Sequence, residues 1–424
     1  MATKKGAKKG AGRAARTLRS LVYITALGVA LAVYNAVSLR RDVALAIGPK
    51  SKDQEQFFRD SAERPDIATF FKNLSPTQRL RMSKNIGRYS DPELAKLCGK
   101  CLGSFDPAAR VALTDSLAVV SRAHPDATAA LLTLPGSFQQ LAISTALRSA
   151  GPTALPLVAK EFSEGDARPN AVAYLVAAGQ SAVSSTIPYL SNADKDIRLA
   201  AADTLGKIRA TQAVGLLTKM LQTTDEEERL AYLTALAGIG DPSSETLMTQ
   251  TLKDESLPTQ HRAQAALGLG VIGTTSSLTT LWSFAPTLDK SLRESAISAL
   301  QVAGDPALRL RSWGQGKLRS QDPLLQVAGG VRSTLADQII RQAISSPETS
   351  RHAAEVSGNR PSLVDSLVRQ AKLADAATQG DVIDSIFRAL ATTAEGRIKL
   401  KNMETSTATP ALAALASRRL SFQR

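Results

Sequence analysis

An arginine recurs at a nearly fixed interval through the middle of this chain, and that interval limits the folds open to it. The recurring positions lie 28 to 33 residues apart, and each is followed seven residues later by a leucine or isoleucine. Seven of the eight are arginine and one is glutamine: Arg79, Arg110, Gln140, Arg168, Arg198, Arg229, Arg262 and Arg293. A period in this range is typical of stacked repeats, in which each unit buries its apolar face against its neighbours.

Each repeat predicts two helices joined by a short turn. After Arg229 an apolar-periodic run reaches Ile239-Gly240-Asp241-Pro242, where glycine favours a helix end and proline favours the start of the next helix. The second run of a repeat also has apolar residues at helical spacing, as at Val214, Leu217 and Leu221. Apolar residues make up 43% of the chain and aromatics only 4%. Alanine and leucine therefore dominate, which favours close packing of helices in an all-α protein.

The register of these residues resembles the HEAT-repeat family. The resemblance rests on an aspartate shortly before the arginine, as with Asp289 before Arg293, on small residues and leucines after it, and on an Ile-Gly or Gly-Asp-Pro turn. The repeat at Arg262 has Pro258-Thr259-Gln260 in place of the acid, and the repeat at Gln140 lacks the arginine. The resemblance is clear over residues 66–308 and degrades after them.

The resemblance implies a right-handed α-solenoid of about 8 to 11 helix pairs. It further implies that the second helices line a concave face that binds protein partners, and that the aspartates and arginines form a structural hydrogen-bond ladder between repeats. Over residues 309–424 we expect divergent helical repeats and a C-terminal cap, with helical runs at 323–345, 361–373, 379–392 and 408–420.

The net charge of +14 is concentrated at the two ends of the chain. Residues 1–59 carry twelve Lys/Arg against three acids, residues 60–308 carry 23 against 25, and residues 309–424 carry 17 against 10. The repeat body is therefore close to neutral. This argues against a broad basic face for nucleic acid along the repeats.

Residues 1–20 predict a basic, disordered tail, because they contain seven basic residues, no acid, and mostly alanine and glycine otherwise. The tail either attracts anionic lipid or nucleic acid, or only fixes membrane topology. The uncharged residues 21–39 follow, and their length suits a single transmembrane helix. A cleaved signal peptide ending at Ala36-Val37-Ser38, an organellar presequence and a buried helix remain alternatives.

The charge balance around residues 21–39 predicts a single-pass protein of the inner or cytoplasmic membrane. Its N-terminus would be cytoplasmic and its repeats extracytoplasmic, which means periplasmic in a bacterium. Residues 40–65 are expected to be a linker, since Gly48-Pro49 breaks any continuation of the spanning helix.

Residues that break the repeat pattern are the candidates for partner binding. Trp282 lies off the shared core register, so it either projects onto the concave face or packs in the core beside Phe284. A small basic patch with an aromatic residue follows the clear repeats and would meet an acidic partner or anionic lipid, unless it is only a solvated loop. The patch consists of Arg309, Arg311, Trp313, Lys317 and Arg319.

Few residues suggest chemistry. Cys98 and Cys101 are the only cysteines, and their spacing leaves open a redox pair, half a metal site, a local disulfide or two small buried residues. The family includes metal-dependent hydroxylases with His-Glu motifs, but no His-Glu dipeptide occurs here. Repeat-containing phycobilin lyases are similar in period, yet no site residue matches. No catalytic, cofactor or metal site is therefore predicted.

The leading function hypothesis is a membrane-anchored, non-catalytic scaffold that binds a protein partner or a larger assembly. One alternative is a cofactor-loading or lyase-like enzyme on the same scaffold. The other is a nucleic-acid-associated protein that acts through residues 1–20.

Overall fold

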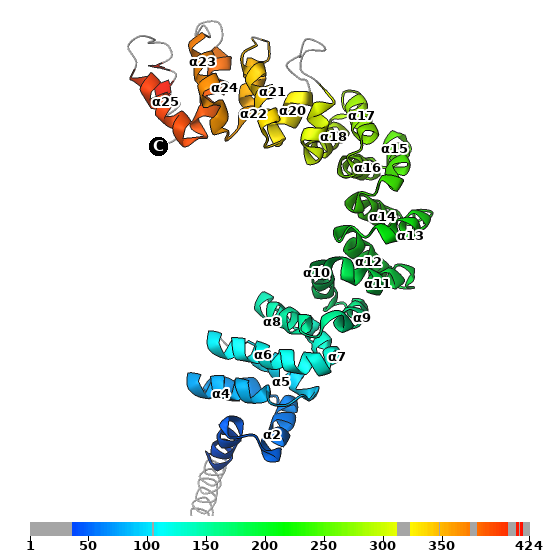
Figure 1. Ribbon diagram of the computed structural model, residues 1–424, viewed down its shortest axis with the longest axis vertical. Coiled ribbons are helices and arrows are strands. Elements are labelled where there is room, and N and C mark those ends of the chain that lie inside the picture. Colours follow the sequence, from blue (N-terminus) through cyan, green and yellow to red (C-terminus); the bar gives the residue numbers. More distant parts are fainter. Residues whose placement is uncertain are drawn as a thin grey trace, which may run out of the picture. The chain divides into compact units, whose positions relative to one another are not determined.

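The computed structural model describes residues 36–103, 106–311, 323–346, 348–373, 380–405, 413–414 and 416–418, and their regular structure is helical. Contacts divide the chain into two units, residues 1–186 and 187–424, which are described separately. In both units the helices alternate between two layers (Figure 1). We call the helix that carries the repeat arginine or glutamine, and its equivalents after Arg293, the first helix of a repeat, and the helix after it the second.

In unit 1 the first helices α4, α6 and α8 stack in sequence, and α5, α7, α9 and α11 form the layer behind them. The helices are α2 (Lys52–Glu63), α3 (Ile67–Asn73), α4 (Pro76–Ile86), α5 (Glu93–Cys101), α6 (Pro107–Ala123), α7 (Pro125–Ala129), α8 (Ser137–Arg148), α9 (Ala154–Lys160), α10 (Arg168–Ala178) and α11 (Val183–Thr186).

In unit 2 each first helix contacts the next along the series α12, α14, α16, α18, α20, α22 and α24. The odd-numbered helices from α13 to α25 are the second helices and pack beside them. The helices are α12 (Lys195–Lys207), α13 (Val214–Met220), α14 (Glu226–Ile239), α15 (Glu245–Lys253), α16 (Thr259–Ile272), α17 (Thr275–Phe284), α18 (Lys290–Ala303), α19 (Asp305–Arg309), α20 (Pro323–Gly330), α21 (Thr334–Ile344), α22 (Ser350–Ser357), α23 (Val364–Leu373), α24 (Gly380–Ala391) and α25 (Ala394–Glu404).

The turn residues end and begin helices as their chemistry requires. Gly240 ends α14 in the left-handed conformation at φ 67°, which its missing Cβ allows without strain. Asp241 then accepts a hydrogen bond from the Ser243 N–H at the start of a short 3-10 turn, with Pro242 as its first residue. An aspartate is likewise the N-cap residue of α6, α12, α14 and α18.

The apolar residue seven positions after each repeat arginine or glutamine forms the core. All eight are fully buried: Ile86, Leu117, Leu147, Leu175, Leu205, Leu236, Leu269 and Leu300. Burying such a side chain contributes about 1.5 to 3 kcal/mol. The repeated register therefore encodes one continuous row of core residues within each unit.

The predicted N-terminal transmembrane helix is corrected by the structure. Within the described residues no helix is long and apolar enough to cross a membrane. Residues 21–35 of the predicted span lie outside the described residues, as does the tail 1–20. Residues 36–39 belong to a helix over 36–47 that continues through charged Asp42, which pairs with Arg64 at 2.6 Å. The predicted single-pass membrane localisation depended on that span and is corrected with it.

Residues 40–65, expected to be a linker, instead contain helical structure that packs on the repeats. Gln54 of α2 donates to the carbonyls of Leu45 and Gly48 at 2.7 and 3.0 Å. From α4, Asn85 donates to the Ala46 carbonyl at 3.0 Å. The carbonyls left unpaired at the end of helix 36–47 are thereby satisfied, so this segment extends unit 1.

Candidate functional site

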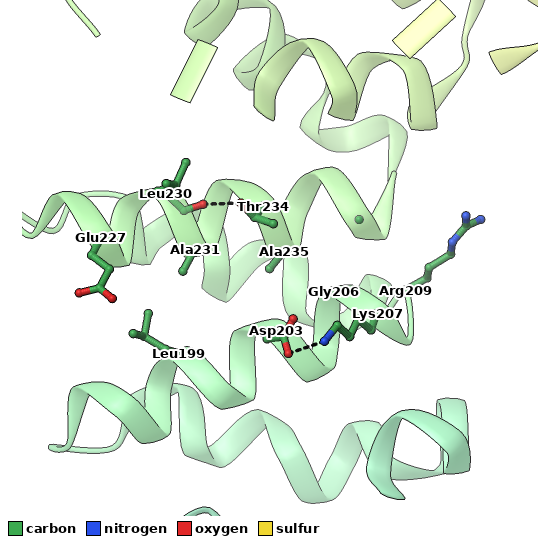
Figure 2. Close-up of a pocket in the computed structure, with 11 residues that line it drawn as sticks. Leu199, Asp203, Gly206, Lys207, Arg209, Glu227, Leu230, Ala231, Thr234 and Ala235 are labelled. Atoms are coloured by element: carbon green, nitrogen blue, oxygen red, sulfur yellow. Dashed lines mark hydrogen bonds and ion pairs between the residues drawn. The ribbon is translucent and has the colours of Figure 1, made fainter. Parts of the chain in front are cut away.

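A groove of about 650 Å³ lies between α12 and α14, on the face of the first-helix layer of unit 2 (Figure 2). Apolar and small residues form its floor, and charged residues stand at its edges. Its lining consists of Leu199, Asp203, Gly206, Lys207, Arg209, Glu227, Leu230, Ala231, Thr234, Ala235 and Gly238. Every one of these residues belongs to or borders a first helix, whereas the sequence directed attention to the second helices.

The groove exists because small residues occupy the place where α12 and α14 meet. A Cβ on Gly206 would lie 2.8 Å from the Cα of Ala235, and a Cβ on Gly238 would lie 3.1 Å from the Gly206 carbonyl oxygen. No side chain therefore separates the two backbones at this point, and the glycines have no side chain that would fill the groove. The apolar side chains of Leu199 and Leu230 flank this strip and are only partly exposed.

The charges at the edge of the groove are largely paired within the chain. Lys207 donates to Asp203 at 2.8 Å, one turn earlier on the same helix. Glu227 accepts from Lys195 at 2.7 Å. The lining thus offers apolar contact, with little net charge and no nucleophile placed beside a general base. Its chemistry suits binding.

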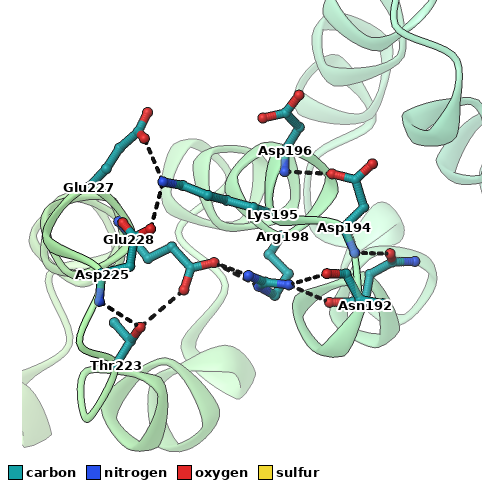
Figure 3. A network of polar contacts seen from close by, with 10 residues as sticks. Asn192, Asp194, Lys195, Asp196, Arg198, Thr223, Asp225, Glu227 and Glu228 are labelled. Carbon is teal, nitrogen blue, oxygen red and sulfur yellow. Dashed lines mark hydrogen bonds and ion pairs between the residues drawn. The ribbon is translucent and has the colours of Figure 1, made fainter.

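A network of polar contacts joins the repeats next to the groove (Figure 3). Lys195 bridges Asp225 and Glu227, each at 2.7 Å, and its hydrogen bond holds the pKa of Asp225 below the ordinary value. Arg198 donates through Nε to the Glu228 carboxylate at 2.8 Å, and Glu228 is only 6% exposed. These ion pairs join the start of α14 to the start of α12 beside the groove.

The repeat arginines share one structural role. In the seven repeats whose contact lies within the described residues, the side chain donates to a carbonyl at the end of the preceding helical segment or in the turn after it, where carbonyls lack a helical partner. The bonds are Arg79 to Lys72 (3.4 Å), Gln140 to Leu132 (3.1 Å), Arg168 to Phe162 (2.8 Å), Arg198 to Asn192 (2.8 Å), Arg229 to Thr223 (2.9 Å), Arg262 to Leu252 (3.0 Å) and Arg293 to Leu288 (3.1 Å). We call this contact the arginine joint.

The arginine joint refines the ladder that the family resemblance implied. Gln140 breaks the sequence pattern but keeps the joint, because its amide donates to the same kind of carbonyl. The aspartates mainly cap their own helices, as Asp194 does for α12. Contacts between repeats are also made, by Lys195 to Asp225 and by Arg198 to Glu228.

Of the predicted partner-binding residues that the structure describes, Trp282 and Arg311 are brought together. Trp282 of α17 is 8% exposed, and its indole N–H donates to the Ala307 carbonyl at 2.9 Å. Arg311 lies over its ring at 5.2 Å, and Arg309 is exposed at the end of α19. Their role in partner binding stays a prediction. Because Trp282 is mostly buried, only a small part of its side chain is accessible to a partner. Trp313, Lys317 and Arg319 lie outside the described residues.

Cys98 and Cys101 are buried in α5, and both thiols are free in the structure. Burial raises the pKa of Cys101 to about 12 and also raises the pKa of Cys98. The reactive thiolate is disfavoured in such surroundings. Pairing of the two in solution stays a prediction.

The groove was missed because its residues look ordinary in the sequence. The sequence nevertheless contained an indication of it. The residue eight positions after one repeat arginine packs against the residue six positions after the next repeat arginine. Gly206 meets Ala235 in this way, and Gly270 meets Ala299. Small residues at both places mark the steps at which first helices come closest.

Two layers of paired helices, joined repeat to repeat, define a helical-repeat protein. Residues 216–301 match the family model for HEAT repeats. Over these residues the chain matches the HEAT-repeat family, which confirms the resemblance seen in its register, and the other described helices continue the same two-layered α-solenoid. Arrays of this kind provide extended surfaces for binding other proteins.

Solved structures with a similar fold are distant. They include an engineered protein (18% identity, TM-score 0.28, 90% of this chain and 98% of that chain). Human deoxyhypusine hydroxylase is 14% identical, with a TM-score of 0.27 over 64% of this chain and 98% of that chain. Kap121p is 12% identical, with a TM-score of 0.35 over 91% of this chain and 48% of that chain. No curated protein matches the sequence.

Proposed function

We propose that this protein is a non-catalytic scaffold, and that the groove between α12 and α14 holds apolar side chains of a protein partner. The groove carries the proposal, because it is an open, apolar, preformed surface on a fold suited to protein binding. The resemblance implied a partner on a concave face lined by second helices. We place the partner on the face of the first helices instead.

The groove favours a partner segment with small or aliphatic side chains along one face and few charges. Its floor is backbone and alanine, so a side chain that enters it meets no polar group that would be left unpaired. An amphipathic helix laid along the groove is a recurring solution for such a surface. The paired edge charges, Asp203 with Lys207, would then lie at the polar rim of the interface.

Two matched threonines allow a direct test. Thr234 lies in the groove, and Thr279 lies on α17 in the second-helix layer. Both are exposed, and each hydroxyl donates to the carbonyl four residues earlier, at 2.8 and 2.7 Å. A photo-reactive residue in place of Lys207, at the edge of the groove, first identifies the partner of the full chain, and the affinity of the purified partner is then measured for the tryptophan variants.

We expect Thr234→Trp to weaken binding by about tenfold or more, because the indole fills the groove, while Thr279→Trp leaves the affinity unchanged. Circular dichroism confirms that both variants fold. Equal affinities for the wild type and Thr234→Trp would reject the groove as the binding surface. Turnover of the partner or of a small molecule by the full chain would reject the non-catalytic role.

A further inference from the structure

Unit 1 exposes three large apolar side chains on the neighbouring first helices α6 and α8. Val111 of α6 is 63% exposed, and Phe138 and Leu141 of α8 are 54% and 62% exposed. The outer face of a helix in a soluble array is ordinarily polar. A cluster of aromatic and aliphatic side chains on such a face marks an interaction surface.

The repeat register places these residues in one row. Val111 directly follows Arg110, Leu141 directly follows Gln140, and Leu80 directly follows Arg79, so they occupy the same position on the stacked helices α6, α8 and α4. The guanidinium of Arg110 lies 4.1 Å from the centroid of the Phe138 ring. This cation–π contact holds the ring on the surface beside a positive charge.

The same three helices are strongly basic. Together α4, α6 and α8 contain six Lys/Arg and a single acid, Asp115. Lys84, Arg122 and Arg148 are exposed, and none of them has a carboxylate partner among the residues that the structure describes. The net charge summed over residues 60–308 is near zero and therefore did not reveal this local excess of basic residues.

We infer that this face, formed by α4, α6 and α8, binds an acidic, amphipathic segment of a protein partner. Apolar side chains of that segment cover Val111, Phe138 and Leu141, and its carboxylates meet Lys84, Arg122 and Arg148. Opposite charges around an apolar centre give both attraction and register. A nucleic acid would satisfy the basic side chains through its phosphates, but it would leave the apolar row in water. None of these residues lines the groove between α12 and α14.

A synthetic peptide tests the inference on the full chain. The probe is a fluorescein-labelled helix of about 15 residues, with leucine and phenylalanine at helical spacing on one face and glutamate elsewhere. Binding is followed by fluorescence anisotropy. Three further probes are a peptide with lysine in place of every glutamate, a single-stranded oligonucleotide, and vesicles of phosphatidylcholine with phosphatidylserine.

We expect the acidic peptide to bind and the lysine peptide to bind at least tenfold more weakly. Replacing both anchors, Phe138→Ser with Leu141→Ser, weakens binding by about tenfold or more. The single charge reversal Lys84→Glu weakens it about threefold and reduces its salt dependence. Matched controls in unit 2 are Val302→Ser, which removes an apolar side chain 64% exposed, and Lys219→Glu. Both controls leave the affinity unchanged.

Three results overturn the inference. One is equal binding of the acidic and lysine peptides. Another is tighter binding of the oligonucleotide or the vesicles that Lys84→Glu weakens, since that dependence assigns the binding to this face and not to residues 1–20. The third is an affinity for the acidic peptide that neither Lys84→Glu nor the double variant changes. Thermal melting checks that each variant folds. If the double variant does not fold, Lys84→Glu alone decides, since it alters an exposed side chain only.

Discussion

The first helices of the two units share one register but expose different chemistry. In unit 1, α4, α6 and α8 carry six basic residues against one acid, while in unit 2, α12, α14 and α16 carry five against five. The apolar residue directly after the repeat arginine also has different surroundings in the two units. Val111 stands exposed, whereas Leu199 and Leu230 line a groove. The register thus determines the fold, and the outward positions determine what each unit offers to a partner.

The steps between first helices differ as well. In unit 2, Gly206 meets Ala235 and Gly270 meets Ala299, so the backbones approach closely. At the step from α8 to α10 in unit 1, Arg148 and Tyr174 occupy the equivalent positions. These large side chains keep helices apart, and α8 and α10 do not stack as the first helices of unit 2 do.

The largest effect is expected at a close step. In Gly270→Val the new Cβ would lie 2.4 Å from the Ala299 carbonyl oxygen, so α16 and α18 must separate. We expect a loss of about 3 kcal/mol in the free energy of unfolding, measured with urea. Gly215→Ala in α13 is the control, because nothing lies within 4 Å of its Cβ. It should stabilise by about 0.5 to 1 kcal/mol; a similar loss in both variants would contradict the account of close packing.

The arginine joint at Arg198 in unit 2 and the glutamine joint at Gln140 in unit 1 should differ in strength. Arg198→Met removes the ion pair to buried Glu228 and a bond to the Asn192 carbonyl, whereas Gln140→Met removes neutral hydrogen bonds only. We expect losses of about 2 and about 1 kcal/mol, measured by thermal unfolding. The reverse order would show that the charge at the joint contributes nothing.

Acid should act more strongly on unit 2 than on unit 1. Burial favours a raised pKa for Asp337, but hydrogen bonds from Ser362 and Arg360 hold this pKa below its ordinary value. The stabilisation is therefore complete above the pKa of the unfolded chain and is lost as the pH falls through the lower, folded value. Unfolding measured between neutral pH and strong acid should show this loss.

The matched variants for this pH effect are Asp337→Asn and Asp66→Asn. The first should cost about 1.5 kcal/mol at neutral pH and flatten the acid limb of the stability curve. The second should change little, because Asp66 in unit 1 is 62% exposed and its ion pair with Arg64 is screened by solvent. Identical acid limbs for the wild type and Asp337→Asn would rule out this carboxylate as the source.

The smallest effect on stability is expected at the exposed apolar row. Leu141→Ser should change the unfolding free energy by no more than about 0.5 kcal/mol, because the side chain is already 62% exposed. Leu147→Ala, at the buried core position of the same helix, should cost about 3 kcal/mol. A large loss in Leu141→Ser would mean that this row serves the fold and not a partner.

The sequence predicted what depends on local register. The arginine interval, the buried residue seven places on and the glycine and proline turns gave the helix pairs, because each rests on neighbouring residues. The groove could not be predicted in the same way, since it depends on Gly206 and Ala235 meeting across two repeats. The basic face of unit 1 was hidden when charge was summed over the whole repeat body. The transmembrane prediction rested on the uncharged length of residues 21–39 and on the charges that flank them, and neither shows that the helix at residues 36–39 continues through Asp42, which pairs with Arg64.

The arginine joint has a consequence for how such an array grows. In the seven joints given above, the side chain reaches a carbonyl five to ten residues before it, as Arg229 reaches Thr223. The donor and the acceptor therefore travel together in one short stretch of sequence. A duplicated repeat would therefore add its own arginine joint, and a deleted repeat would remove its own. The joints of the neighbouring repeats would stay intact. Arrays of this design can change length by whole repeats, without any compensating change elsewhere at the joint.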